Sequence, residues 1–385
     1  MKGGSGTRFW RGNVADSRPS RRGRIAARLT RLGEPANRVA EAQAAYDAGR
    51  FDDVLALLEA AGDAPEAWRL RSLAAFRSGD MAAAADAAAA LLAGTDPSAE
   101  AQRGPRFDVL AVAVVACGEL ARYDAMLAQV REMLGLAARS GGLPEYVRAR
   151  GTAANAFALL GDPWAAQRLL GELAGLFQGG NGPAALEATV RGNHASVCLA
   201  VARLAAGGGD EAAAAEALDH AAASIARSRE IAAAAGDSRI AAFADVHEAE
   251  LALLRGRGAE AQGALAGAIA QAEARRLHAH ARQLRLLDAE ILLAAGEARA
   301  AQAQLERLAA MLGPQHELSV RIRSAALLHD VLLALEDPLG ARVHLAAART
   351  LETARLYHQL RAQSQFLRTR LELEHLYRYR DGAPR

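Results

Sequence analysis

Apolar residues recur at three- and four-residue intervals along most of the chain, from about Val39 onward. This spacing is that of one face of an α-helix, and no stretch of useful length alternates with the period of two of a β-strand. Short turns interrupt the pattern, and most contain a glycine, which can end a helix in the left-handed conformation. The sequence therefore predicts antiparallel helix pairs. Their turns are expected near residues 49, 79, 122, 161, 208, 256, 296 and 336.

Small residues stand at fixed distances from five of the turn glycines. Seven residues before the glycines are Ala42, Ser72, Ala154, Ala249 and Ala289. Five residues after them are Val54, Ala84, Ala166, Ala261 and Ala301. Small side chains at both offsets allow the two helices of a pair to cross closely, as a stacked helix-pair repeat requires.

The turns differ in their chemistry. Asp80, Asp162 and Glu297 follow a turn glycine, where a carboxylate can accept hydrogen bonds from the free N–H groups of the next helix. The turns near Arg122 and Glu336 lack the glycine.

The segments Ala42…Gly49-Arg50-Phe51…Val54 and Ala154…Gly161…Ala166 resemble the tetratricopeptide repeat. That pattern has a small residue, a glycine at the turn, an aromatic residue two positions later and an alanine five positions later. The turn-to-turn distance grows from 30 residues (Gly49 to Gly79) to 40 (Gly256 to Gly296), against about 34 in the family. The resemblance covers about residues 38–348. It implies an all-α, right-handed α-solenoid of about eight antiparallel helix hairpins.

Composition adds few constraints. Apolar residues make up 51% of the chain and aromatic residues 4%, so we expect a long, thin core. Because each hairpin buries its apolar side against its neighbours, we expect the stack to form a curved ribbon. The only cysteines, Cys117 and Cys198, lie in apolar stretches and are interpreted as buried free thiols. The N-terminus lacks the apolar region of a signal peptide, and the longest clean apolar run, Val109–Cys117, is too short to span a membrane. We expect a cytoplasmic protein.

Three domains are predicted: a tail at 1–35, a repeat domain at 36–348 and a long C-terminal helix at 349–385. The tail contains Lys2 and eight arginines against Asp16 and Glu34, although the whole chain has a net charge of only +2. We interpret this tail as disordered and solvated; binding of nucleic acid or anionic lipid through its charge is the alternative. Nucleic-acid binding by the rest of the chain is not expected.

The C-terminal helix is predicted as one uninterrupted element from Arg349 to Arg380. Its apolar residues suggest a packing seam, which either caps the last repeat or acts in dimerisation or signal relay. The residues of this dimerisation or relay seam are Leu356, Leu360, Phe366, Leu367, Leu371 and Leu373. Residues 367–380 resemble the linker helix that joins such repeats to a GGDEF diguanylate cyclase domain in bacterial proteins. That resemblance implies a sensory module whose output domain is absent from this sequence.

Motifs for enzymatic chemistry are sparse. Gly-Gly-Asp-Glu at 208–211 is followed by Ala212 and flanked by alanine-rich helices, so a helix-start turn is favoured over a cyclase signature. No Cys-x-x-Cys, His-x-x-x-His or His-Glu-x-x-His spacing occurs, and a lysine-containing phosphate loop is excluded because Lys2 is the only lysine. We expect no metal, no cofactor and no enzyme; a catalytic site built from scattered residues is the competing hypothesis.

The sequence thus favours a bacterial protein-interaction scaffold, with the cyclase-type sensory module as the alternative. The first helix of each stacked pair usually lines the inner surface, so its polar residues are the candidate contacts for a bound peptide or protein. These candidates are Arg148, Asn155, Asn193, His194, His247, Glu250, Arg282, Arg285 and Arg323.

Overall fold

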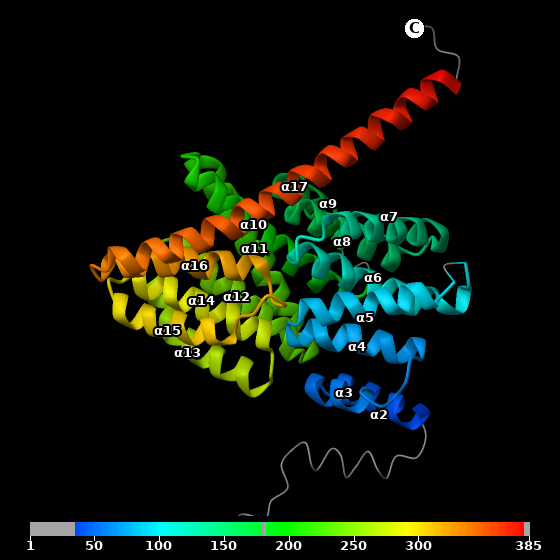
Figure 1. Cartoon of the computed structure of the whole chain (residues 1–385), viewed down its shortest axis with the longest axis horizontal. Helices are drawn as coiled ribbons and strands as arrows, with labels where there is room; N and C mark the ends of the chain where they lie inside the picture. The colour runs from blue at the N-terminus through cyan, green and yellow to red at the C-terminus, as the bar shows by residue number, and fades with distance from the viewer. Residues whose placement is uncertain (1–34, 97, 179, 181, 381–385) are drawn as a thin grey trace, which may run out of the picture.

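The computed structural model describes residues 35–380, apart from residues 97, 179 and 181. Every regular element in these ranges is an α-helix, which confirms the predicted all-α class (Figure 1). None of the described helices combines the length and the apolar character needed to cross a membrane. The predicted N-terminal tail lies outside the described residues.

The helices form eight antiparallel hairpins, and all eight turns fall where the sequence places them. The first four hairpins are α2 (Pro35–Asp47) with α3 (Phe51–Leu58), α4 (Pro65–Ser78) with α5 (Met81–Gly94), α6 (Glu100–Glu119) with α7 (Tyr123–Ser140), and α8 (Leu143–Leu159) with α9 (Pro163–Gly175). The second four are α10 (Ala184–Gly207) with α11 (Glu211–Ala235), α12 (Ser238–Leu254) with α13 (Gly258–Ala274), α14 (His278–Ala294) with α15 (Ala298–Met311), and α16 (Leu318–Ala334) with α17 (Pro338–Arg380).

The hairpins cross at the predicted small residues. Nine of the ten positions flanking the five turn glycines are buried, and only Ala261 is partly exposed. In the second hairpin the crossing is so close that the Ser72 hydroxyl donates to the Ala84 carbonyl at 3.0 Å. The fixed offsets in the sequence therefore reflect real helix contacts, and the sixth hairpin departs from them.

Helix ends follow the expected turn chemistry in part. The carboxylates of Asp80 and Asp162 accept hydrogen bonds from helix N–H groups at 2.9 and 3.0 Å, whereas Glu297 makes no such bond. In the two turns that lack glycine, Ala121 and Glu336 themselves adopt the left-handed conformation, with φ of 57° and 61°. Side chains with a Cβ are strained there, so these turns are less favourable than their glycine counterparts.

We predict that Glu336→Gly raises the free energy of unfolding. Relief of the left-handed strain of about 1–2 kcal/mol is partly offset by the flexibility of glycine in the unfolded chain, which leaves a gain of about 0.5–1 kcal/mol. Urea denaturation of the full chain measures it. The matched control is Gly296→Ala, at φ 81° in the equivalent turn with open space around it, and should lose about 1 kcal/mol. A neutral or destabilising Glu336→Gly would contradict this account.

The N-terminal and C-terminal hairpins contact each other directly. At the α4–α5 turn, the Arg282 guanidinium from α14 donates to the Gly79 carbonyl at 3.0 Å. The backbone N–H groups of Met81 and Ala82, at the start of α5, donate to the Gln315 carbonyl at 3.0 and 3.3 Å. The loop before α16 thus satisfies donors that an isolated helix end leaves free.

Further contacts of this kind join the same two halves. The Glu119 carboxylate, at the end of α6, accepts from the hydroxyl and the N–H of Ser319 in the first turn of α16, at 2.9 and 3.3 Å. At the C-terminal end of α8, the carbonyls of Leu159 and Leu160 accept hydrogen bonds from Gln359 and Gln363 of α17, at 2.7 and 2.6 Å. Each contact satisfies a helix terminus, which makes the closure specific in position.

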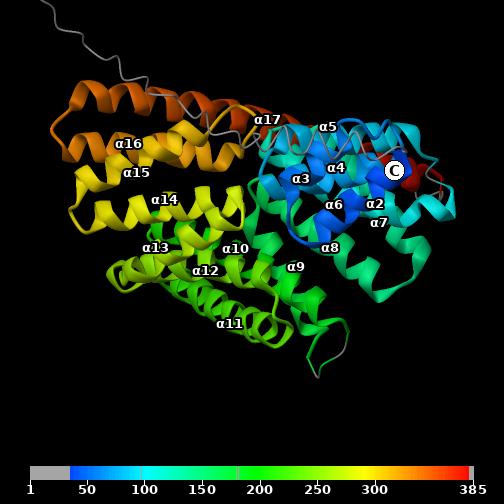
Figure 2. The same cartoon turned by 90° about the horizontal axis from the view of Figure 1, so that it is seen from below.

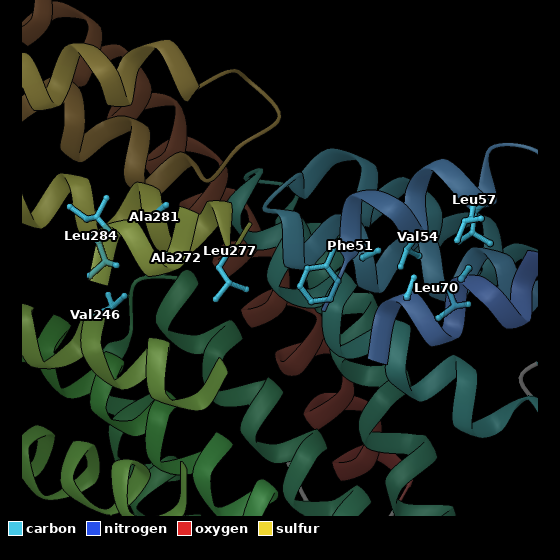
Figure 3. Close-up of a cluster of buried hydrophobic side chains, with 14 of the residues drawn as sticks. Phe51, Val54, Leu57, Leu70, Val246, Ala272, Leu277, Ala281 and Leu284 are labelled. Carbon is cyan, nitrogen blue, oxygen red and sulfur yellow. The ribbon is translucent and has the colours of Figure 1, made fainter. Parts of the chain in front are cut away.

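An apolar core spans the junction as well (Figure 3). One buried cluster includes Phe51 and Leu70 from the first two hairpins. The same cluster includes Leu277, in the loop between α13 and α14, and Leu284 of α14. The solenoid curves until hairpins far apart in sequence share a core (Figures 1 and 2). The curved ribbon of stacked hairpins is present, but its closure on itself was not predicted.

Helix α17 begins at Pro338 as the second helix of the last hairpin, and its C-terminal part extends away from the body (Figure 1). The helix expected from Arg349 is thus the later part of a longer element. Leu356 and Leu360 are exposed on it. The other seam residues, Phe366, Leu367, Leu371 and Leu373, lie outside the residues whose side chains are described.

Candidate partner-binding surface

The first helices of successive hairpins form one continuous surface. α4 packs on α6, α6 on α8, α8 on α10, and so on through α16. No comparable contact joins successive second helices in the described part of the chain, so the row of first helices lies on the inside of the curve. All the predicted contact residues lie on these first helices, although not all of them reach the surface.

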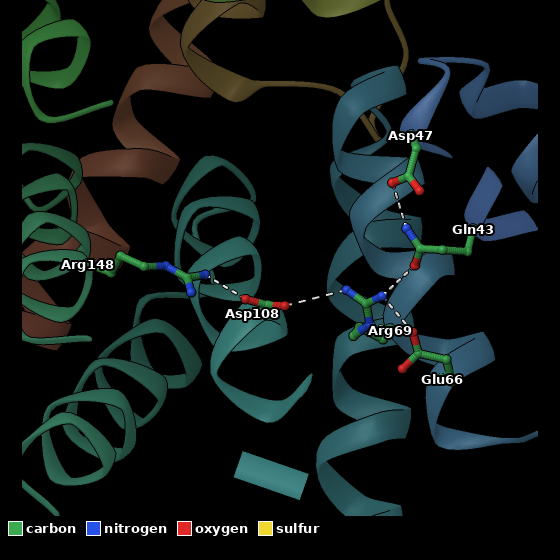
Figure 4. A network of polar contacts seen from close by, with 6 residues as sticks. All are labelled: Gln43, Asp47, Glu66, Arg69, Asp108 and Arg148. Carbon is green, nitrogen blue, oxygen red and sulfur yellow. Dashed lines mark hydrogen bonds and ion pairs between the residues drawn. The ribbon is translucent and has the colours of Figure 1, made fainter. Parts of the chain in front are cut away.

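A polar network, the N-terminal ladder, links the first helices of hairpins one to four (Figure 4). Arg69 donates to Gln43 at 2.7 Å and to Glu66 at 2.6 Å, and it reaches Asp108 at 3.4 Å. Asp108 in turn accepts from Arg148 at 2.7 Å. Burial alone would lower the pKa of Arg69, but the hydrogen bond and charge of Glu66, with Asp108, raise it.

A second network, the C-terminal ladder, links α10, α12, α14 and α16. Arg203 contacts Glu250 at 2.7 Å and Glu290 at 3.0 Å. Arg323 binds both oxygens of Glu290 at 2.8 Å and approaches Glu250 at 3.5 Å. Burial would raise the pKa of Glu250, but the charges of Arg323 and Arg203 lower it below its ordinary value. The ladder is neutral overall and joins four consecutive hairpins.

The N-terminal ladder ends on α8 and the C-terminal ladder begins on the next first helix, α10. Asn155 on α8 and Asn193 on α10 are partly exposed there. Neither amide makes a hydrogen bond to another residue in the described ranges. An amide both donates and accepts, so it can pair with the backbone of an extended peptide.

The remaining predicted contact residues divide by burial. Arg285 is partly exposed and donates to Gln304 at 2.9 Å and to Glu273. His194, His247 and Arg282 are buried, so in this conformation they are packing residues rather than surface ones. Arg282 is a candidate in the sequence because it is a polar residue on a first helix; its contact with Gly79, from a distant hairpin, cannot be seen in the sequence.

Buried ionisable groups on these helices have little reactivity. Burial, together with the charges of His220 and Arg191, lowers the pKa of His194 to about 4. Burial raises the pKa of Cys198 to about 12, although its sulfur lies 3.5 Å from the His194 Nε2 atom. At neutral pH the thiol is therefore protonated and a poor nucleophile. In the described ranges no three metal-ligating side chains are grouped to hold an ion.

The structure thus defines an all-α solenoid of helix hairpins with a polar inner surface. No family model and no curated protein matches the sequence. Among solved structures, a tetratricopeptide repeat protein from Parabacteroides merdae is similar, at 12% identity over 78% of this chain and 100% of that chain, with a TM-score of 0.43. RapI in its apo form is similar at 11% identity over 75% and 98% of the two chains, with a TM-score of 0.49. Neither similarity concerns more than the fold.

Proposed function

We propose that this protein is a non-enzymatic interaction scaffold that holds an extended segment of a partner protein across the first helices of its central hairpins. The observation that carries the proposal is the pair of amides, Asn155 and Asn193, between two ladders whose charges are already matched. Partner backbone would pair with the amides. The guanidinium groups of Arg148 and Arg203, on the same two helices, are also partly exposed and would bind partner carboxylates.

The ladders suit this role because they are rigid. Each guanidinium is held by carboxylates from neighbouring hairpins, so little side-chain entropy remains to be lost when a partner binds. The contacts that join the N-terminal hairpins to α14, α16 and α17 likewise fix the curvature of the surface.

Selection of binders from a random peptide library displayed on phage supplies a defined ligand for the test. Binding of a selected peptide is expected to weaken about tenfold or more in Asn155→Ala/Asn193→Ala, since two polar contacts of about 1 kcal/mol each are lost. Titration by fluorescence anisotropy measures it. The control variant is Gln302→Ala on the second helix α15, where the Gln302 amide donates to Glu306 one turn along its own helix. Unchanged affinity in the double alanine variant would remove this assignment.

A bacterial signalling role is part of the same proposal, on the resemblance of residues 367–380 to a cyclase linker. In that form α17 relays occupancy of the repeats to a second protein. Amide hydrogen exchange on the selected peptide complex tests the relay: altered protection of residues 366–380 supports it, and protection changes confined to α8 and α10 contradict it.

A further inference from the structure

The last hairpin exposes a regular row of side chains along α17. We define the outer seam as Leu339, Val343, Ala346, Thr350, Thr353, Tyr357, Leu360 and Ser364. Intervals of four and three residues alternate along the row, which is the heptad spacing of a and d positions in a coiled coil. All eight residues are exposed, and the four largest, Leu339, Val343, Tyr357 and Leu360, are 75%, 67%, 61% and 61% exposed.

The outer seam faces directly away from the body. The heptad positions opposite it contain Ala341, Ala348 and Ala362, which are all buried. The α17 helix therefore uses one side for its own repeat and presents the side with Leu339, Val343, Tyr357 and Leu360 to solvent. Terminal repeats of a solenoid normally have a polar outer face, so an exposed apolar row here indicates a surface that another helix covers.

The middle of the outer seam is small. Ala346, Thr350 and Thr353 lie between the larger end residues, and the Thr350 hydroxyl already donates to the Ala346 carbonyl at 2.8 Å. The Thr350 hydroxyl would therefore keep a hydrogen-bond partner when another helix covers it. Because the side chains here are small, a partner helix could approach closely at this point.

Charge identifies the kind of helix that fits. Arg342, Arg349 and Arg361 occupy the positions that flank the seam, and all three are exposed. None of them makes an ion pair with any residue that the structure describes. The only carboxylate between residues 339 and 364 is Glu352, which is turned to the body side and pairs with Arg355 at 2.5 Å. Every charged residue at the flanks of the seam is therefore basic.

A second copy of the chain matches these flanks poorly. In an antiparallel pair the like flanking positions meet, so arginine would face arginine. In a parallel pair Arg342 and Arg349 would face Ala347 and Ala354, which offer no charge. Carboxylates at the flanking positions of a different helix would meet each arginine with an opposite charge.

We infer that the outer seam is a docking site for an acidic amphipathic helix of a partner protein, which pairs with α17 as a two-stranded coiled coil. The partner helix has apolar residues at its a and d positions and glutamate or aspartate beside them. This site lies on the side of α17 opposite to the face that packs on its own repeat. It is separate from the surface of the first helices, and the proposal does not depend on binding there.

The probe for the test is a synthetic peptide of about four heptads, the length of the outer seam, with leucine at a and d and glutamate at the flanking positions. A second peptide has lysine in place of each glutamate. Fluorescence anisotropy with the full chain should show binding of the glutamate peptide, weakening as salt rises, and no binding of the lysine peptide. Equal binding of both peptides, or of neither, would overturn the proposal.

Three variants sharpen the test. Val343→Lys/Leu360→Lys should weaken binding about tenfold or more, whereas Leu204→Lys, at an exposed leucine on α10, should leave it unchanged. Arg342→Glu/Arg349→Glu/Arg361→Glu should lose the glutamate peptide and gain the lysine peptide, an exchange that misfolding does not produce. Sedimentation that shows a dimer of the parent chain, dissociated by Val343→Lys/Leu360→Lys, would instead make a second copy the occupant and refute the proposal.

Discussion

Replacement of Arg282 by methionine is expected to lower the free energy of unfolding by about 3–5 kcal/mol. The side chains of Arg282 and Glu317 are only 3% and 6% exposed, and they pair through several hydrogen bonds, one at 2.7 Å. Loss of the guanidinium leaves a buried carboxylate without a counter-charge and deprives the Gly79 carbonyl of its donor. Both penalties fall on the junction between the two halves of the solenoid.

The control for this prediction lies one turn further along α14. Arg285 also pairs with a carboxylate, that of Glu273, but the pair is partly exposed and does not touch the N-terminal hairpins. Arg285→Met should therefore lose less than about 1 kcal/mol. Urea denaturation measures both variants, and small-angle scattering should report a larger radius of gyration for Arg282→Met alone. Equal stability of the two variants would show that the junction contributes little.

A double variant separates the charge from the shape of the junction. In Arg282→Met/Glu317→Leu no charge is buried, and apolar replacements of buried ion pairs are often close to neutral. Only the Gly79 carbonyl remains without a donor. The free energy of unfolding of the double variant should therefore be about 1–3 kcal/mol below that of the parent, and higher than that of Arg282→Met. A double variant as unstable as Arg282→Met would instead assign the effect to lost packing.

The hairpins were predictable because each is encoded locally. The turn glycines, the small residues at fixed offsets and the helical periodicity all lie within one repeat, so the sequence alone placed all eight turns. Even the turns without glycine were placed, although Ala121 and Glu336 carry backbone strain there that the sequence did not indicate.

The closure was not predictable because its contacts cross the chain. Gly79 and Arg282 are 203 residues apart, and a close approach between their hairpins depends on the accumulated curvature of every repeat between them. A small error in the predicted rotation between neighbouring hairpins adds up over the repeats, so the predicted ends would no longer meet. The same limit applies to the site: Arg282 and Arg285 look alike in sequence, but one is buried in the junction and the other is partly exposed on the inner surface.

The sixth hairpin shows where the repeat rule relaxes. Ala166 and Ala301 are fully buried at their crossings, whereas the equivalent Ala261 lines a groove of about 520 Å³ between α12 and α13. Ala249 and Leu265 line the same groove. This crossing is therefore less completely packed at Ala261 than the equivalent crossings at Ala166 and Ala301.

This difference predicts opposite outcomes for the same substitution. Ala166→Leu forces a larger side chain into a close-packed crossing and should lose about 1–3 kcal/mol of unfolding free energy, because the helices must separate or the leucine must leave its preferred rotamers. In Ala261→Leu the leucine side chain enters the groove instead, so the free energy of unfolding should stay within about 0.5 kcal/mol of the parent value. Urea denaturation of the full chain compares the two variants.

The comparison discriminates between two origins of the groove. If α12 and α13 stand apart in solution, Ala261→Leu is tolerated, because the groove accommodates the larger side chain without displacing either helix. If instead the sixth hairpin closes as tightly as the others, the two leucine variants lose similar stability. The second result would extend the close-crossing rule to every hairpin and leave no groove at this position.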